Sequence, residues 1–256
     1  MNALKTALIT RTPQLGLWQT LAHPYAAEVC AGIGFDWLLF DGEHAPNTVR
    51  TLLAQLQAVS HLPVAAVVRP PVGDPVIIKQ YLDIGFLNLL IPMVESATQA
   101  RQLVAATRFP PSGIRGVASS TIRASGFGRD SCYLHDGHES ICVIAQIESR
   151  VGLEAIETIA AVQGIDALFI GPSDLAAALG HLGDPQHPEV QSAIANGLDR
   201  IHGAGKPSGI FASSADDARR RVEQGVTLVS IGTDIALLFN QGTRLLTEVR
   251  RSVKKP

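Results

Sequence analysis

The stretch Trp37–Pro46, WLLFDGEHAP, contains the feature on which the predicted fold depends. It begins with four large apolar residues that lack polar–apolar alternation, as strands buried on both faces do. It ends abruptly in Asp41-Gly42-Glu43-His44, three ionisable groups around a glycine. We interpret this change as a core strand that leaves the hydrophobic interior at its C-terminal end.

The same kind of unit recurs along the whole chain. Eight short apolar runs are candidate strands, at 15–18, 37–40, 64–68, 89–94, 141–147, 167–171, 209–212 and 228–232. Amphipathic stretches follow with helix start and stop signals, at 48–60, 74–85, 96–109, 151–164, 187–206 and 214–225, and a last helix covers 235–251. Repeated βα units imply a parallel sheet, and eight of them in 256 residues predict an α/β fold, a (β/α)₈ TIM barrel forming a single domain over 1–256. A doubly wound sheet is the alternative, but no G-x-G-x-x-G follows the first strand.

Residues 110–140 form one long, polar, glycine-rich segment that fits neither pattern. We interpret it as an extended βα loop after the fourth strand. Loops of this length in compact domains are usually functional, so we expect it to influence substrate choice.

Composition excludes several classes of protein. Hydrophobic residues make up 46% of the chain and charged residues 17%, which favours a large core over disorder. With 21 basic and 23 acidic residues there is no basic excess to attract nucleic acid or anionic lipid. Cys30, Cys132 and Cys142 have no paired spacing, and neither a signal peptide nor a run of ~18 apolar residues is evident. We expect a cytoplasmic protein without nucleic-acid or membrane partners.

Polar residues at the ends of the predicted strands suggest a metal site. Glu148 and Asp174 are separated by one strand–helix–strand step, so they should lie at neighbouring strand ends. Two hard carboxylates with room for water suit Mg²⁺ or Mn²⁺. The alternative is that Glu148 pairs with an arginine such as Arg69 or Arg115. Zinc is less favoured because no Cys/His cluster has ligand spacing, and we assign no role to the histidines of the helix and loop segments, His23, His61, His181, His187 and His202.

Two further residues are candidates for acid–base and electrostatic roles. His44 follows Asp41 by three residues, and an acid beside a histidine can orient the ring as a base near pH 7. Otherwise His44 is a surface-loop histidine. Arg69 follows five small apolar residues, so its guanidinium begins at core depth and could bind a carboxylate or an enolate oxygen. A salt bridge to Asp83 or Glu43 is the alternative.

The positions of the lysines argue against Schiff-base chemistry. That mechanism needs a lysine at a strand end in an apolar pocket. Those present are Lys5, Lys79, Lys206, Lys254 and Lys255, and none follows a predicted strand.

The segment GPSDLA, 171–176, is predicted to form a strand-to-helix turn whose backbone N–H groups could hold a small anionic group.

Taken in order, these motifs resemble one enzyme family, the class II pyruvate-dependent aldolases. The resemblance runs from about Leu15 to Arg250 and includes FDWLLFDGEHAPNTV, VVRPP, IPMVESATQAR, QIESR and GIDALFIGPSDLAAALG. It implies a metal-dependent barrel that assembles as a homo-oligomer, a hexamer, with active sites at subunit interfaces. The apolar residues Leu237, Leu238 and Phe239 would then pack on a partner subunit, or alternatively close the barrel.

The resemblance also implies roles for individual residues. Glu148 and Asp174 would hold a divalent ion, Mg²⁺, Mn²⁺ or Co²⁺. His44 would be the general base, assisted by Asp41 and Asp83, and Arg69 would stabilise an enolate. The substrate would be contacted by Gln146, Gly171, Pro172, Ser173 and Phe211.

The implied reaction is the reversible aldol cleavage of 4-hydroxy-2-oxo acids to pyruvate and an aldehyde, a carbon–carbon lyase activity in the breakdown of aromatic compounds. Related alternatives act on 2-dehydro-3-deoxy sugar acids or decarboxylate oxaloacetate through the same enolate. A barrel without catalytic activity that serves as a scaffold is the alternative from a different class.

Overall fold

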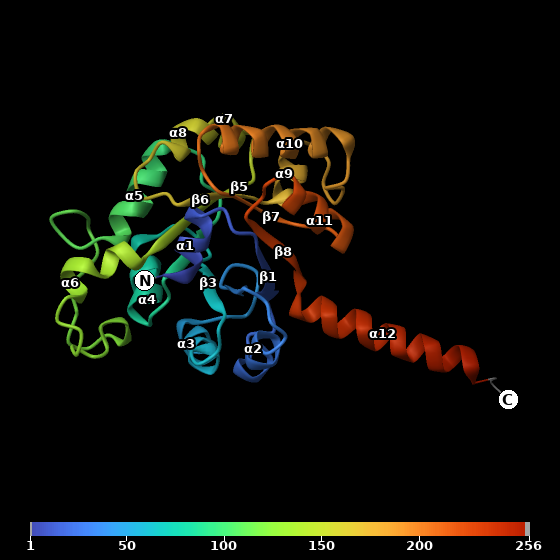
Figure 1. The fold of residues 1–256 in the computed structure, drawn as a ribbon, viewed down its shortest axis with the longest axis horizontal. Helices are drawn as coiled ribbons and strands as arrows, with labels where there is room; N and C mark the ends of the chain where they lie inside the picture. Colours follow the sequence, from blue (N-terminus) through green and yellow to red (C-terminus); the bar gives the residue numbers. More distant parts are fainter. Residues whose placement is uncertain (1, 254–256) are drawn as a thin grey trace.

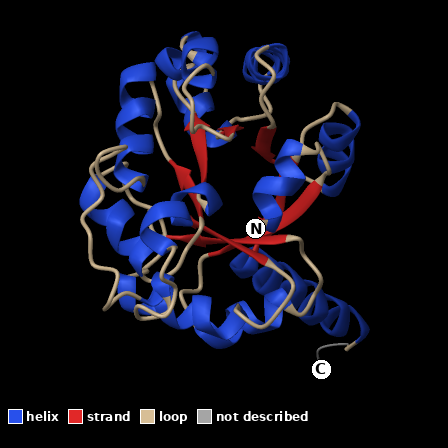
Figure 2. Cartoon of the chain, turned by 60° about the vertical axis from the view of Figure 1, so that its left-hand side comes forward, coloured by secondary structure: helices blue, strands red, loops and turns tan. Residues whose placement is uncertain are grey.

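A computed structural model describes residues 2–253 of the chain. Eight parallel strands close into a barrel in sequence order, with the last strand paired to the first (Figures 1 and 2). The predicted single-domain TIM barrel is therefore confirmed. The strands are β1 (Gln14–Gln19), β2 (Trp37–Asp41), β3 (Ala65–Arg69), β4 (Asn88–Ile91), β5 (Cys142–Ile147), β6 (Ala167–Ile170), β7 (Ser208–Phe211) and β8 (Leu228–Thr233).

Helices cover the outside of the barrel between the strands, except that the first precedes β1 and the last follows β8 and projects away from the barrel. They are α1 (Ala3–Ile9), α2 (Pro24–Ala31), α3 (Val49–Val59), α4 (Pro75–Asp83), α5 (Ala97–Thr107), α6 (Tyr133–Asp136), α7 (Arg150–Glu154), α8 (Ile156–Ala160), α9 (Pro172–Ala178), α10 (Pro188–Gly203), α11 (Ala215–Glu223) and α12 (Asp234–Ser252). The helix predicted at 151–164 is interrupted at Ala155, which separates α7 from α8.

The core has two layers, as the uninterrupted apolar strands require. An outer layer packs the strands against the helices. The inner layer fills the barrel with large side chains that include Trp18, Trp37 and Phe169. A Cβ on Gly16 would overlap the Trp37 ring, so this glycine makes room for the indole. Leu4 and Leu8 of α1, a helix that the sequence patterns did not predict, pack into the N-terminal end of the barrel.

Residues 110–140 are not a βα loop, and our prediction of their place was wrong. They connect α5 to β5, so they lie at the N-terminal ends of the strands, where Arg123 Nη1 donates to the Ile84 carbonyl oxygen at 3.0 Å. The segment contains α6 and two 3₁₀ turns (Arg123–Ser125 and Gly137–Ser140), and Phe109, Ile122 and Tyr133 form a small core of its own. It therefore does not border the strand ends where this chain would carry out chemistry.

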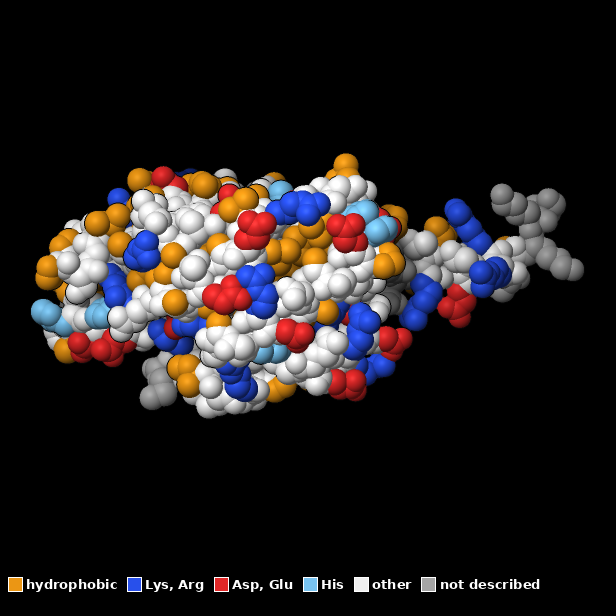
Figure 3. All heavy atoms as spheres, turned by 90° about the horizontal axis from the view of Figure 1, so that it is seen from above, with side chains coloured by type: hydrophobic (Ala, Val, Ile, Leu, Met, Phe, Trp, Pro, Cys, Tyr) orange, Lys and Arg blue, Asp and Glu red, His pale blue; other side chains and the backbone are white. Residues whose placement is uncertain are grey.

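The last helix, α12, leaves the barrel instead of packing against it (Figures 1 and 3). Its beginning is anchored by Asp234, whose carboxylate accepts the backbone N–H groups of Thr20 and Leu21. Farther along, Leu238 and Phe239 are 67% and 70% exposed, so they do not close the barrel of their own chain. Within the described residues, no helix combines the length and apolar character that a membrane crossing requires.

Candidate active site

A cavity of about 200 Å³ opens at the C-terminal ends of the strands. Eight of the site residues predicted from the sequence line this cavity. The full lining consists of Trp18, His44, Arg69, Gln146, Phe169, Gly171, Pro172, Ser173, Asp174 and Phe211. Trp18 and Phe169 were not predicted, because in the sequence they look like ordinary core residues; their rings lie 5.8 Å apart.

Arg69 enters the cavity from β3 and is held by two carboxylates. Its Nε and Nη2 groups donate to both oxygens of Asp41 at 2.9 and 2.8 Å, a side-on pair in which both residues are buried. Its Nη1 lies 2.9 Å from Glu43 Oε2 as an ion pair without hydrogen-bond alignment. Burial alone would lower the Arg69 pKa, but the Asp41 and Glu43 carboxylates outweigh it and raise the pKa. The guanidinium is thus charged and fixed in orientation.

The expected pairing of Asp41 with His44 is not found. Both Asp41 oxygens bind Arg69, since Asp41 and Arg69 are directly paired residues of neighbouring strands. The acid nearest His44 is Glu43, with 3.7 Å between His44 Nε2 and Glu43 Oε2. Burial raises the Glu43 pKa, and nearby Arg69 and His44 oppose that shift. The His44 side chain is 66% exposed, so it can exchange protons with a bound molecule or with water.

Glu148 is a buried carboxylate immediately after β5. Its Oε1 accepts the backbone N–H of Met93 at 2.9 Å, and its Oε2 accepts a hydrogen bond from Gln146 Nε2. Among residues 2–253 it has no ion-pair partner, so neither Arg69 nor Arg115 neutralises it in the way the alternative prediction required. Burial raises the pKa of Glu148 to about 7, although the Met93 N–H lowers it and the neighbouring Asp174 charge raises it further.

Local backbone features make room for this carboxylate. A Cβ on Gly171 would overlap Glu148 Oε2 and crowd Gln146 Nε2, so the glycine before α9 allows the strand ends to approach. Met93 has a positive φ of 53°, which is unusual for a residue with a side chain. In this conformation its N–H reaches Glu148. Nothing in the sequence marks Met93 for this role.

Glu148 and Asp174 have the donor set of a site for a hard divalent cation. Asp174 lies in the first turn of α9 and is exposed to the cavity, whereas Glu148 lies beneath it. Buried charges are normally paired or bound to a metal, and a cation here would supply the positive charge that Glu148 lacks. Two protein carboxylates leave coordination positions for water and substrate, as Mg²⁺ sites usually do. The residues therefore fit a metal of this class.

Asp83 lies elsewhere in this chain. It is the last residue of α4, and it accepts a hydrogen bond from Arg115 Nη2 at 2.8 Å. Arg115 is itself buried, against Phe109 and against Tyr133 of the 110–140 region. Within a single chain, then, Asp83 stabilises the N-terminal end of the barrel. Its predicted assistance to His44 would require the Asp83 of a second copy.

The lysines lie where the sequence placed them. Lys5 is in α1, Lys79 is in α4, and Lys206 precedes β7 and donates to the Ile165 carbonyl oxygen. Lys254 and Lys255 lie outside the described residues. No lysine between residues 2 and 253 borders the cavity.

Comparison with known proteins gives a consistent picture. Residues 14–241 match the HpcH/HpaI aldolase/citrate lyase family. The chain is 57% identical to the hydroxypyruvate/pyruvate aldolase of Deinococcus radiodurans over 93% of this chain and 86% of that protein. It is 53% identical to the 4-hydroxy-2-oxo-heptane-1,7-dioate aldolase of Salmonella dublin, over 93% and 90%.

A solved structure agrees with these sequence relatives. An HpcH/HpaI aldolase/citrate lyase family protein from Burkholderia cenocepacia superimposes with a TM-score of 0.95 at 42% identity, covering 98% of this chain and all of that one. The aldolase resemblance drawn from the strand-end motifs is thereby confirmed, and the chain belongs to the HpcH/HpaI aldolase/citrate lyase family.

Proposed function

We propose that this protein is a class II aldolase, a carbon–carbon lyase that reversibly cleaves 4-hydroxy-2-oxo acids to pyruvate and an aldehyde. One observation carries the proposal. Arg69, held by two hydrogen bonds to Asp41, lies at the cavity together with Glu148, a buried carboxylate that has no ion-pair partner among the described residues. Together with Asp174, and in the absence of a bordering lysine among the described residues, this arrangement suits enolate chemistry assisted by a metal.

The family is metal-dependent, and Glu148 and Asp174 are the residues that would hold the ion. Mg²⁺, Mn²⁺ or Co²⁺ fits the two carboxylates. When bound, such an ion supplies Lewis-acid polarisation of the 2-oxo group. The free Oε1 of Gln146, which is buried without a hydrogen-bond partner in the described structure, would accept a hydrogen bond from water or substrate.

The chain's own residues would then handle charge and protons. Asp41 occupies two of the five guanidinium N–H groups of Arg69, and Glu43 Oε2 lies 2.9 Å from Nη1. The remaining N–H groups would donate to the enolate oxygen as negative charge develops. In cleavage, His44 would take the 4-hydroxyl proton as the C3–C4 bond breaks and would then return a proton to C3 of the enolate, which gives pyruvate. In synthesis it would take a methyl proton from pyruvate and give a proton to the alkoxide that forms from the aldehyde. Glu43, 3.7 Å away, stabilises the imidazolium formed in either direction.

The size of the cavity bears on the substrate. About 200 Å³ is below the roughly 300–1,000 Å³ of drug-sized ligand pockets, and it suits a three-carbon oxo acid. Backbone N–H groups at Ser173, after Gly171 and Pro172, would contact its carboxylate. Phe211, packed 5.3 Å from Trp18, forms an apolar wall toward the aldehyde. The names of the relatives favour pyruvate or hydroxypyruvate as the donor. The first cleavage substrate to test is 4-hydroxy-2-oxoheptanedioate, which would yield pyruvate and succinate semialdehyde.

The proposed assembly is a homo-oligomer, a hexamer in the aldolases that the chain resembles. Most of the stability of helices in proteins comes from packing an apolar face, and beyond its anchored beginning α12 carries exposed apolar residues. On the neighbouring α2, Tyr25 and Val29 are 71% and 58% exposed, four residues apart on one face. Because both faces are apolar and both adjoin β1, we propose that α12 of a second copy covers α2.

Proton exchange into pyruvate tests the enolate step directly. Pyruvate in D₂O with the purified protein should lose its methyl proton signal in the NMR spectrum. The loss should stop after chelation and return with Mg²⁺ or Mn²⁺, while circular dichroism shows that the chelated protein remains folded. No exchange in the presence of metal would refute pyruvate enolisation.

Product analysis then separates the related reactions. Incubation with 4-hydroxy-2-oxoheptanedioate, a 2-dehydro-3-deoxy sugar acid and oxaloacetate should give the fastest pyruvate release from the first. Faster release from a sugar acid would reassign the substrate, and faster release from oxaloacetate would reassign the protein as a decarboxylase. A scaffold without catalytic activity would show neither exchange nor product with any of them.

A further inference from the structure

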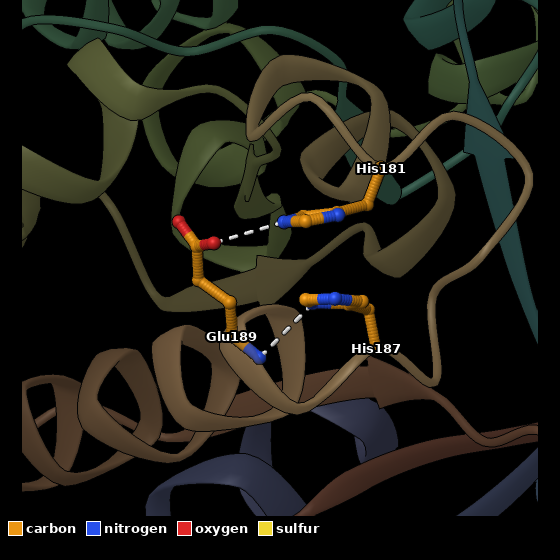
Figure 4. Close-up of side chains that lie close together, drawn as sticks. All are labelled: His181, His187 and Glu189. Carbon is orange, nitrogen blue, oxygen red and sulfur yellow. Dashed lines mark hydrogen bonds and ion pairs between the residues drawn. The ribbon is translucent and has the colours of Figure 1, made fainter.

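A second group of metal-ligating side chains lies on the connection between α9 and α10, outside the cavity. It consists of His181, His187 and Glu189, which we call the histidine cluster (Figure 4). The three residues fall within nine positions of the sequence, but their spacing matches no common zinc motif, and the sequence patterns gave the histidines no role. The fold brings them together because the connection turns back onto the first turn of α10.

The two imidazoles are stacked, and the Glu189 carboxylate lies beside the edge of His181 (Figure 4). The ring centroids are 3.5 Å apart with an interplanar angle of 15°. His181 Nε2 lies 2.9 Å from Glu189 Oε2, and the backbone N–H of Glu189 donates to His187 Nδ1 at 3.3 Å. Each residue offers one ligand atom, and all three atoms lie within 4.8 Å of one another.

We propose that the histidine cluster binds a divalent transition-metal ion of the zinc class. Two imidazoles and one carboxylate form the N/O donor set that zinc uses, whereas Mg²⁺ prefers oxygen ligands alone. The ion would therefore differ in kind from the one held by Glu148 and Asp174. It would be partly exposed, with water completing its coordination, since the Glu189 side chain is 56% exposed.

The three side chains must shift to accept the ion. Ligand atoms about 2.0–2.1 Å from a tetrahedral zinc are roughly 3.3 Å apart, so the His181–Glu189 contact of 2.9 Å must open by a few tenths of an ångström. The ion takes the place of the proton that this pair shares. Stacked rings point their in-plane lone pairs in nearly parallel directions, so His187 must also turn, which breaks its 3.3 Å hydrogen bond and the ring stack with His181.

Binding would add a link to a connection that is already held by hydrogen bonds. The end of α9 is held by Arg150, which donates to the carbonyl oxygens of Ala178 and Leu179, both at 3.2 Å. Closer to α10, Gln191 Nε2 donates to the Pro185 carbonyl oxygen at 2.7 Å. An ion at the histidine cluster would add a link between these two anchors. We therefore expect the ion to raise the melting temperature.

Zinc titration by calorimetry tests this proposal. The full-length protein would be titrated with Zn²⁺ in excess Mg²⁺, which keeps the catalytic site occupied, and each variant would be checked by circular dichroism. Replacement of one ligand, in His181→Ala or Glu189→Gln, should weaken Zn²⁺ binding by at least about tenfold. The matched control, His135→Ala, removes an exposed histidine of α6 and should bind Zn²⁺ as the parent does.

A Glu148→Gln background separates the two sites, because it removes a catalytic ligand and leaves the histidine cluster intact. The Zn²⁺ isotherm and the rise in melting temperature should persist in it. Two results would overturn the proposal: an unchanged isotherm in both cluster variants, or loss of all Zn²⁺ binding in Glu148→Gln. The first would leave the cluster as a helix cap and ion pair, and the second would assign the bound zinc to the catalytic site.

Discussion

Replacing Glu148 by glutamine should make the metal-free protein more stable above neutral pH and leave it unchanged at acid pH. Burial raises the pKa of Glu148 to about 7 from an ordinary value of 4.5. Glutamine is nearly the same size and can still accept the Met93 N–H. The Gln146 amide can turn so that its unpaired Oε1 accepts from the new amide group.

The sign and magnitude follow from proton linkage. Between pH 4.5 and 7 the folded protein keeps the Glu148 proton that the unfolded chain has lost, so stability falls as the pH rises through this window. A difference of about 2.5 pKa units at 1.36 kcal/mol each amounts to about 3 kcal/mol, as an order of magnitude. Below pH 4.5 Glu148 is protonated in both the folded and the unfolded protein, so its burial costs no charge. Above pH 7 it is charged in both, and the folded protein bears the full cost of the buried charge. Glutamine does not titrate and avoids this cost.

Urea unfolding in the presence of a chelator, at fixed protein concentration and at several pH values, measures the effect. The parent and Glu148→Gln midpoints should coincide near pH 4.5 and separate by pH 8, with the variant higher. Glu223→Gln, which changes an exposed carboxylate of α11, is the matched control and should follow the parent. Parallel curves for the parent and Glu148→Gln would refute the idea that an uncompensated buried charge exists at this position.

Three further results are expected. His44→Ala should lower kcat by about 10²–10⁴-fold without changing the urea midpoint, because the side chain is exposed; equal turnover would remove His44 from the mechanism. Arg69→Ala should lose activity and also about 3–5 kcal/mol of stability, because it leaves the Asp41 carboxylate buried without its partner. Arg69→Lys should keep more of the stability than of the activity. An Arg69→Ala protein as stable as the parent would contradict the structural role of the Arg69–Asp41 pair. Leu238→Glu combined with Phe239→Glu should reduce the mass measured by light scattering, and an unchanged mass would show that α12 does not hold copies together.

Much of this architecture could be predicted because its signals are local. Strands buried on both faces lack alternation, so all eight could be located from apolar runs alone. The change from apolar to polar residues at their ends identified Arg69, Glu148 and Asp174 as candidates, and the structure places Arg69 and Asp174 on one cavity, whereas Glu148 is buried next to Gly171 of its lining. These predictions depended only on the rule that parallel strands end on the same side.

The errors concern features that sequence spacing does not encode. His44 is closer than Arg69 to Asp41 along the chain, but strand register places Asp41 opposite Arg69, and register is not visible in one sequence. Residues 110–140 were interpreted as a βα loop because of their length, although they follow the helix predicted at 96–109 and not a strand. A segment between a helix and the next strand must lie at the N-terminal end of the barrel, so in this case the chain order already contained the answer.

Charge balance at the cavity links the metal to the substrate. Asp41, Glu43 and Glu148 accompany a single guanidinium, and Asp174 adds another carboxylate at the opening. Asp41 already compensates Arg69, so the remaining acids would repel a 2-oxo acid, which is itself an anion. A divalent cation at Glu148 and Asp174 would offset most of that negative charge and would also give the oxo acid a charge to bind. On the proposed function, the same excess of acid that makes Glu148 costly in the metal-free protein would therefore make the site selective for substrates that can chelate an ion.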